Sequence, residues 1–218
     1  MTINLSQNNT ILQKFIAEIR DTEIQKDRMR FRRNIERIGE IFAYEISKTL
    51  KYETSTVTTP LGNTEIPKIV DQLILGCVLR ASLPLHTGLL NYFDDADNAF
   101  ISAYRKHHKD GSFEIEVEYL SSPSIDDKVV ILADPMLATG QSMILSYEAL
   151  LLKGKPKHTH FAAVIASSEG LANLENKMPP NSTIWVAVVD DELTAQAYIV
   201  PGLGDAGDLA YGSKEDNE

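Results

Sequence analysis

The sequence contains a single cysteine, Cys77, among its 218 residues. One cysteine cannot form an intrachain disulfide or a cysteine-based zinc site, which argues against a disulfide-stabilised secreted domain. Long apolar runs are missing as well, since none approaches the ~20 residues that a membrane-spanning helix needs. Residues 1–10 are polar and carry neither the basic start nor the apolar stretch of a signal peptide. These features favour a cytoplasmic protein without a membrane span.

Positive charge is scarce in the chain as a whole. Lys and Arg number 21 against 31 Asp and Glu, a formal net charge of −10. Such a molecule is not attracted non-specifically to nucleic acid or to anionic lipid, so any phosphate site must be local. The composition, 43% hydrophobic and 24% charged, is that of a globular protein long enough for one domain with a substantial core.

The chain divides into four segments of one domain, 1–218. Apolar residues recur at three- and four-residue steps between residues 11 and 50, which predicts two amphipathic helices. A stretch rich in β-branched residues, a Pro-Leu-Gly-Asn turn and a short return strand then predict a hairpin arm. The expected segments are N-terminal helices over 1–50, the arm over 54–66, an α/β core over 70–212 and a mobile acidic tail over 213–218.

Four apolar runs without alternation follow the arm. They cover residues 73–79, 129–133, 161–166 and 184–189. Such runs are typical of strands buried on both faces of a parallel sheet. Helical stretches over 142–153 and 170–177 separate three of them, so the pattern predicts a doubly wound α/β domain. Apolar residues alternate with polar ones from Phe113 to Tyr119 instead, which predicts an antiparallel hairpin with one exposed face.

A basic cluster lies between the two predicted N-terminal helices. It could bind nucleic acid, but interspersed acids favour a solvated helix face or a contact between subunits. Its members are Lys26, Arg28, Arg30, Arg32, Arg33 and Arg37.

Residues 134–142, here called the phosphate loop, follow the second apolar run. An acid, Asp134, ends the strand, and Thr139, Gly140 and Ser142 open a helix. Free backbone N–H groups, the positive end of the helix dipole and two hydroxyls make a compact site for a phosphate monoester. Asp134 could hold sugar hydroxyls beside it. An ordinary capped turn would explain the hydroxyls and the glycine, but not the acid at the strand tip.

Residues 198–208, here called the base loop, are rich in glycine. Gly202, Gly204 and Gly207 formally match a dinucleotide-binding fingerprint, but that motif needs a following helix and a distant acid, and only eleven residues remain. The alternative is a loop whose bare backbone approaches a small planar ligand. Uracil is such a ligand, because backbone N–H and C=O groups complement its two oxygens and its N3–H.

These motifs together resemble those of one enzyme family. The phosphate loop resembles the phosphoribosyl-diphosphate (PRPP) loop of uracil phosphoribosyltransferases, and the base loop resembles their uracil loop. Residues 79–82, Leu-Arg-Ala-Ser, resemble the family's diphosphate-binding loop and are called the diphosphate loop below. Tyr104 and Arg105 resemble its flexible-loop arginine motif. The likeness extends more weakly from the basic cluster to Gly212 and so covers most of the chain.

The resemblance implies a type I phosphoribosyltransferase fold. This is a doubly wound, mostly parallel sheet flanked by helices, with N-terminal helices, a β-hairpin arm and a flexible hairpin loop over the active site. The implied reaction transfers ribose 5-phosphate from PRPP to N1 of uracil, giving UMP and diphosphate, with Mg²⁺ carried by PRPP rather than by a protein metal site. A homodimer or higher homo-oligomer and a GTP effector are also implied.

Residue roles follow from the resemblance by position. The implied catalytic residues are Asp205, Arg105 and Arg80. The implied uracil-binding residues are Ile199, Gly204, Asp205 and Ala206. The implied PRPP-binding residues are Arg80, Arg105, Asp134, Pro135, Met136, Leu137, Ala138, Thr139, Gly140, Gln141, Ser142 and Asp205.

Physical chemistry supports these roles. Breaking the C1–diphosphate bond leaves positive charge on the ribose and adds negative charge to the leaving group, so arginines and Mg²⁺ stabilise the transition state. Asp205 could stabilise the cationic ribose or help to remove the N1 proton, and the sequence leaves both roles open. The segment 104–118 is long enough to close over PRPP and exclude water.

The sequence departs from the family pattern at three places. Gln141 follows Gly140 where a second glycine is common, Ser82 follows the Leu-Arg-Ala motif where glycine is usual, and Leu209 stands where an arginine is typical. These changes bear on affinity and regulation rather than on the type of reaction.

Two other functions compete. One is a non-catalytic regulator with the same fold that senses nucleotides and binds RNA through the basic cluster. The other is a purine-type transferase whose acids are Asp190 and Asp191. The loop after those acids lacks the glycine of a phosphate turn, so we expect a structural role for the pair.

Overall fold

The computed structural model describes residues 1–107 and 113–213. The helices are α1 (Leu12–Arg20), α2 (Arg28–Ser47), α3 (Leu83–Leu90), α4 (Gln141–Leu150), α5 (Ser168–Lys177) and α6 (Ala206–Tyr211), with 3₁₀ turns η1 (Leu5–Gln7) and η2 (Leu151–Lys153). The strands are β1 (Thr2–Asn4), β2 (Tyr52–Thr59), β3 (Gly62–Ile69), β4 (Leu73–Leu79), β5 (Asp97–His107), β6 (Phe113–Ser121), β7 (Val129–Ala133), β8 (Met136–Leu137), β9 (His158–Ser167), β10 (Ser182–Asp190), β11 (Glu192–Leu193) and β12 (Ile199–Val200).

A mostly parallel sheet forms the centre of the molecule. Its strands lie in the order β1-β10-β9-β7-β4-β5-β6, and β8 pairs with β9. Every pairing is parallel except that of β5 with β6, which is antiparallel. The chain leaves β4 for β5 on one side and then returns to β7 on the other, so the strand order reverses between β4 and β7. Ligands bind at such a reversal in open α/β sheets, outside the carboxyl ends of the strands.

Two apolar layers cover the faces of the sheet. Val129 and Ile131 of β7 belong to one layer, with residues of α1, α2 and α3. Val130 and Leu132 belong to the other, with residues of α4 and α5. Alternate side chains of one strand thus enter opposite layers, which is why these strands are apolar throughout. The resemblance implied a type I phosphoribosyltransferase fold with a doubly wound, mostly parallel sheet, and this prediction is confirmed.

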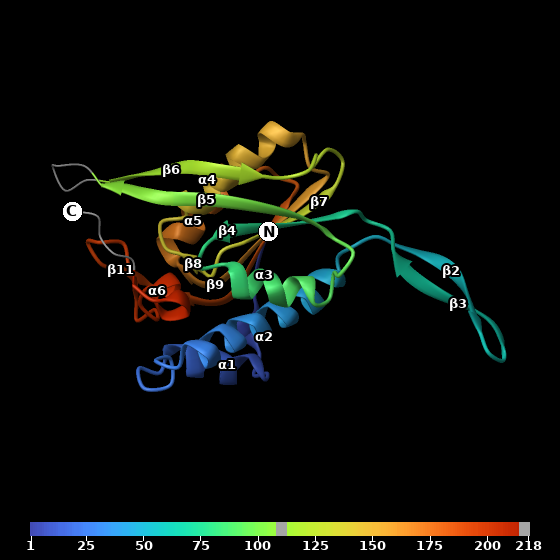
Figure 1. The fold of residues 1–218 in the computed structure, drawn as a ribbon, viewed down its shortest axis with the longest axis horizontal. Helices are drawn as coiled ribbons and strands as arrows, with labels where there is room; N and C mark the ends of the chain where they lie inside the picture. The colour runs from blue at the N-terminus through green and yellow to red at the C-terminus, as the bar shows by residue number, and fades with distance from the viewer. Residues whose placement is uncertain (108–112, 214–218) are drawn as a thin grey trace.

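The predicted arm is present and long. Strands β2 and β3 pair antiparallel from Tyr52 with Ile69 to Thr59 with Gly62, joined by Pro60 and Leu61. The arm extends from one end of the body (Figure 1), and at its base the hydroxyl of Tyr52 donates to Ser47 O at the end of α2 at 3.1 Å. The two predicted N-terminal helices are also confirmed, as α1 and α2.

Several elements were not predicted, among them one at the edge of the sheet and two beside the proposed site. Strand β1 joins the edge of the sheet beside β10, although its three residues carry no apolar run. Helix α3 follows the diphosphate loop directly. Helix α6 begins at Ala206, so the end of the base loop, which we expected to be irregular, is helical.

The predicted antiparallel hairpin is formed by β5 and β6, in which Arg105 is paired with Ile115. Most of the segment 104–118, expected to be a flexible loop, is therefore strand, and its tip, residues 108–112, lies outside the described residues. The same holds for residues 214–218 of the expected acidic tail. Within the described ranges, no helix is both long and apolar enough to span a bilayer.

Candidate active site

Two of the sequence motifs lie side by side at the carboxyl ends of neighbouring strands. The diphosphate loop follows β4 and the phosphate loop follows β7, the two strands at which the strand order reverses. The hydroxyl of Ser82 donates a hydrogen bond to the carbonyl of Ala133 at 2.7 Å, directly before Asp134. Ser82 is fully buried, so the serine that departs from the family pattern ties the two loops together.

Asp134 lies at the tip of β7, as the sequence predicts, and is only 9% exposed. Its backbone N–H donates to Ala162 O at 3.0 Å, and its Oδ1 accepts from Met136 N at 3.2 Å. Burial raises the pKa of the Asp134 carboxyl to about 7, and the hydrogen bond from Met136 only partly offsets that rise. The group therefore titrates near neutral pH.

This raised pKa predicts a specific pH dependence of stability. A carboxyl with a pKa of about 7 when folded and ~4 when unfolded favours the folded state at low pH and loses that advantage as the pH rises through 7. Asparagine does not titrate, so Asp134→Asn lacks this loss. From pH 5 to pH 8 the unfolding free energy of the variant should therefore rise relative to that of the parent by on the order of 2 kcal/mol. Urea unfolding of both proteins at the two pH values measures this.

The exposed Asp94 provides the control, as Asp94→Asn. A difference between parent and Asp134→Asn that stays constant with pH would contradict the assignment.

Residues at the start of α5 and within it form hydrogen bonds to the phosphate loop. Ser167 Oγ donates to Ala138 O at 2.5 Å, and Asn173 Nδ2 donates to Thr139 O at 3.2 Å. Gly170 packs so closely that a methyl group there would lie 2.1 Å from Ala138 O. With its carbonyls fixed toward α5, the loop is oriented to present N–H groups to an anion.

The start of α4 also fits an anion site. Gly140 has φ +79°, a conformation that glycine adopts without strain, and it immediately precedes Gln141, the first residue of the helix. Thr139 Oγ1 accepts from Gln141 N at 3.4 Å, but the N-cap of α4 is Gly140, which makes no side-chain capping bond, so neither Thr139 nor Ser142 is the cap that the alternative interpretation proposed. The Gln141 side chain is exposed, so its departure from glycine adds a side chain at the surface of the site.

Arg80, in the diphosphate loop, reaches the base loop. Its Nη2 donates to Asp208 Oδ1 at 2.8 Å and to Gly212 O at 2.9 Å. Its Nε is buried and has no hydrogen-bond partner in the described part of the chain. A buried, unpaired donor is costly unless a ligand satisfies it.

The base loop places Asp205 beside Arg80. Asp205 is exposed and caps α6, since its Oδ1 accepts from Asp208 N at 2.9 Å. A methyl group at Gly207 would lie 3.1 Å from Asp205 Oδ1 and 3.7 Å from Arg80 Nε. Ile199 is buried in β12, Gly204 is exposed with φ +95°, and Ala206 begins α6. The structure thus joins the three loops, 79–82, 134–142 and 198–208, into one site.

Arg105 is a predicted site residue whose side chain cannot be placed relative to the three loops. Its backbone belongs to β5, but its side chain lies outside the described part of the structure, so its expected contact with diphosphate stays a prediction.

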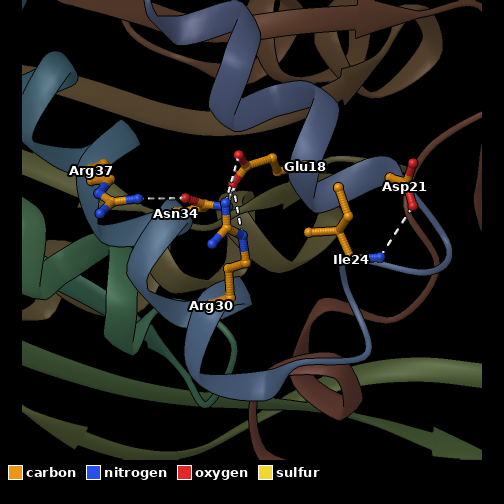
Figure 2. A network of polar contacts seen from close by, with 6 residues as sticks. All are labelled: Glu18, Asp21, Ile24, Arg30, Asn34 and Arg37. Carbon is orange, nitrogen blue, oxygen red and sulfur yellow. Dashed lines mark hydrogen bonds and ion pairs between the residues drawn. The ribbon is translucent and has the colours of Figure 1, made fainter.

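The basic cluster lies mostly on α2 rather than between the two helices, and several of its members are paired within the chain. Arg30 donates two hydrogen bonds to the Glu18 carboxylate of α1, at 3.1 and 2.9 Å (Figure 2). Asn34 donates to the same carboxylate through its Nδ2 and accepts from Arg37 through its Oδ1. These bonds lower the pKa of Glu18. Arg32 donates to Ala210 O at 2.6 Å, and Arg33 pairs with Glu36. Arg30 and Arg32 therefore connect α2 with α1 and α6, contacts that the sequence did not predict. Lys26, Arg28, Arg30 and Arg33 are exposed, as the solvated-face interpretation predicted.

Asp190, an acid of the purine-type alternative, is buried rather than solvated and pairs with Arg20 at 2.9 Å. Sequence reasoning gave it only a general structural role. The supports of the phosphate loop, Ser167, Gly170 and Asn173, were missed altogether. The serine at a strand end before a helix was a visible capping signal, but its reach to residue 138 depends on the fold.

Comparisons with known proteins identify the family of the chain. A model of the family described as "Uracil phosphoribosyltransferase" matches residues 6–213. The chain is 55% identical to a uracil phosphoribosyltransferase of Porphyromonas gingivalis over 97% of this chain and 98% of that protein. It is 38% identical to one of Methanothermobacter thermautotrophicus over 96% and 95%. A solved structure from Aquifex aeolicus superposes with a TM-score of 0.87 at 27% identity, covering 99% and 100%. The chain belongs to the uracil phosphoribosyltransferase family.

Proposed function

We propose that this protein transfers ribose 5-phosphate from PRPP to N1 of uracil, giving UMP and diphosphate. The main supporting observation is that an exposed carboxylate, Asp205, and a guanidinium, Arg80, both lie close to Gly207, with Asp205 Oδ1 3.1 Å and Arg80 Nε 3.7 Å from the position of a methyl group there. The diphosphate loop that carries Arg80 is bonded to the end of β7, directly before the phosphate loop. A site that stabilises a cationic sugar and an anionic leaving group needs both charges at once.

In this reaction the C1–oxygen bond to diphosphate breaks and a bond from C1 to uracil N1 forms. Arg80 has an Nε donor without a partner in the described chain, which suits the charge that develops on the diphosphate. Arg105 is proposed to close on the same group from the hairpin. Asp205 faces the ribose, where its carboxylate stabilises positive charge or accepts the N1 proton.

The phosphate loop is proposed to bind the 5-phosphate through residues 138–142, and Asp134 the ribose hydroxyls. A carboxyl with a pKa of about 7 is partly protonated at neutral pH, and hydroxyl donors favour its charged form. PRPP binding should therefore release a proton from Asp134. Ile199, Gly204 and Ala206 are proposed to read the uracil ring through their backbone groups.

Mg²⁺ is proposed to arrive on PRPP, where it neutralises the diphosphate as that group departs. Asp205 offers the kind of oxygen ligand that Mg²⁺ prefers, and it is exposed. Within residues 1–107 and 113–213, no three His, Cys, Asp or Glu side chains cluster to hold a metal. The exposed carboxylate of Asp205 therefore fits an Mg²⁺ ion that PRPP carries into the site.

An activity assay tests the proposed reaction. The protein is supplied with Mg-PRPP and, separately, with uracil, cytosine, hypoxanthine or orotate. We expect UMP from uracil and little turnover of the other bases. No turnover of uracil, or a preference for hypoxanthine, would overturn the proposal. Adding GTP to the uracil reaction tests the effector that the resemblance implies.

We propose that the arm, β2 and β3, pairs two copies of the chain. A two-stranded hairpin is marginal alone in water, and this one exposes apolar side chains such as Leu61 and Ile66. Light scattering at micromolar protein should give twice the 24.2 kDa of one chain or more, and deleting residues 55–65 should reduce it. A 24.2 kDa mass that persists on concentration contradicts the dimer, and an unaffected dimer contradicts the arm's role.

A cytoplasmic location is also proposed. Cys77 lies buried in β4, where burial raises the pKa of its thiol to about 12. A single unreactive thiol suits a reducing compartment.

A further inference from the structure

Asp190 is a buried acid that the proposed chemistry does not use. It ends β10 and is 8% exposed. Its two carboxylate oxygens have different partners: Oδ1 accepts from Arg20 Nη2 at 2.9 Å, and Oδ2 accepts from Gly202 N at 2.9 Å. One carboxylate therefore connects the end of α1 with the base loop.

Gly202 is the turn of the base loop. It has φ +53°, and a methyl group there would lie 2.1 Å from Ile199 O. The chain thus folds back sharply between Ile199 and Gly204, two residues assigned to uracil. The hydrogen bond from Gly202 N to Asp190 lies inside this turn and is buried.

A second contact holds the next residue of the loop. Asp21 closes a turn after α1 by accepting from Ile24 N at 3.1 Å (Figure 2). The following residue, Gln25, places its side-chain amide against the carbonyl oxygens of Leu203 and Ile19. With the amide nitrogen assigned to the position that faces these two acceptors, it donates to Leu203 O at 3.0 Å and to Ile19 O at 2.9 Å. Segment 19–25 therefore supports both Gly202, through Asp190, and Leu203.

The buried ion pair of Arg20 and Asp190 is better explained by a role in positioning than by stability alone. Charges are expensive to bury, and an ion pair gains little net stability over an apolar contact, so stability alone does not account for it. A base can be recognised by backbone N–H and C=O groups only if these groups are held in place. A loop that is already ordered loses less conformational entropy when the base binds.

We propose that Arg20 and Asp190 are positioning residues that hold the base loop in its uracil-binding conformation. They act through Gly202 and touch neither substrate. The inference rests on the proposed function, because it assigns uracil to this loop.

Steady-state kinetics of Asp190→Ala, Arg20→Ala and Arg20→Lys test the proposal. We expect Asp190→Ala to raise KM for uracil about tenfold or more, the equivalent of about 1.4 kcal/mol in binding, with KM for PRPP changed less than about twofold. Arg20→Ala should act in the same direction, and Arg20→Lys should restore part of the loss. The neighbouring exposed acid provides the control, since Asp191→Ala should match the parent.

Hydrogen exchange of the base loop gives a readout that does not depend on turnover. Backbone amides of residues 199, 200 and 202–205 should exchange faster in Asp190→Ala than in the parent or Asp191→Ala, while exchange in β9 is unchanged. If Asp190→Ala fails to fold, Gln25→Ala provides the same comparison with a smaller change. Normal uracil KM and normal exchange in folded variants would overturn the proposal, as would equal increases in both KM values. If the parent does not convert uracil, the proposed function fails and the exchange result alone decides the positioning role.

Discussion

Asp205→Asn is expected to lower kcat about hundredfold or more while leaving the fold intact. In the proposed reaction positive charge develops on the ribose as diphosphate leaves, and Asp205 is the residue proposed to stabilise it. Its Oδ1 and Arg80 Nε lie 3.1 and 3.7 Å from the position of a methyl group at Gly207. Asparagine removes the charge and the basicity but keeps an oxygen that can accept from Asp208 N, and it caps helices as well as aspartate does. Circular dichroism and the melting temperature should therefore match the parent, and the loss should appear in UMP formation.

Asp191→Asn provides the matched control, because that acid is exposed and lies outside the base loop. A folded Asp205→Asn protein with near-parental turnover would remove Asp205 from the mechanism. A parallel loss of melting temperature and activity would instead show that its main role is the cap of α6.

Gly170→Ala is expected to reduce kcat/KM for PRPP on the order of a hundredfold, because an ångström-scale displacement of a substrate-holding group costs that much. The added methyl would lie 2.1 Å from Ala138 O and 2.6 Å from Leu137 O, so the phosphate loop must move. KM for uracil should change little, because the close contacts of Gly170 are with Ala138 and Leu137 of the phosphate loop. Kinetics with each substrate varied in turn make the measurement.

Asn176→Ala, at an exposed position of the same helix, is the control. Should Gly170→Ala not fold, Asn173→Ala removes only the hydrogen bond to Thr139 O and should raise KM for PRPP several-fold. Parental PRPP kinetics in a folded Gly170→Ala protein would show that α5 does not shape the phosphate loop.

The strands of the sheet illustrate what local sequence predicts well. A run such as 73–79 is apolar throughout because both faces of the strand are buried, and the strand is found at those residues. Strand β1 shows the limit of this reasoning. Its three residues join the sheet through backbone pairing with β10, which leaves no trace in side-chain pattern.

The roles of the residues that depart from the family pattern could be seen only in the structure. Ser82 replaces a usual glycine, and only the fold shows that its buried hydroxyl bonds to Ala133 beside the phosphate loop. Leu209 replaces a usual arginine and packs against the apolar layer that contains α2. Sequence position alone does not say whether such a side chain meets ligand, core or solvent.

By itself, the sequence determined the α/β class, the three loop motifs and the chemistry of their side chains, because these depend on residue type and short-range spacing. The tertiary structure alone decided which distant residues support those loops. Arg20 reaches Asp190 across 170 positions, and Ser167 reaches Ala138 across 29. Such contacts depend on how strands and helices are arranged in space, and no local pattern encodes a partner so far along the chain.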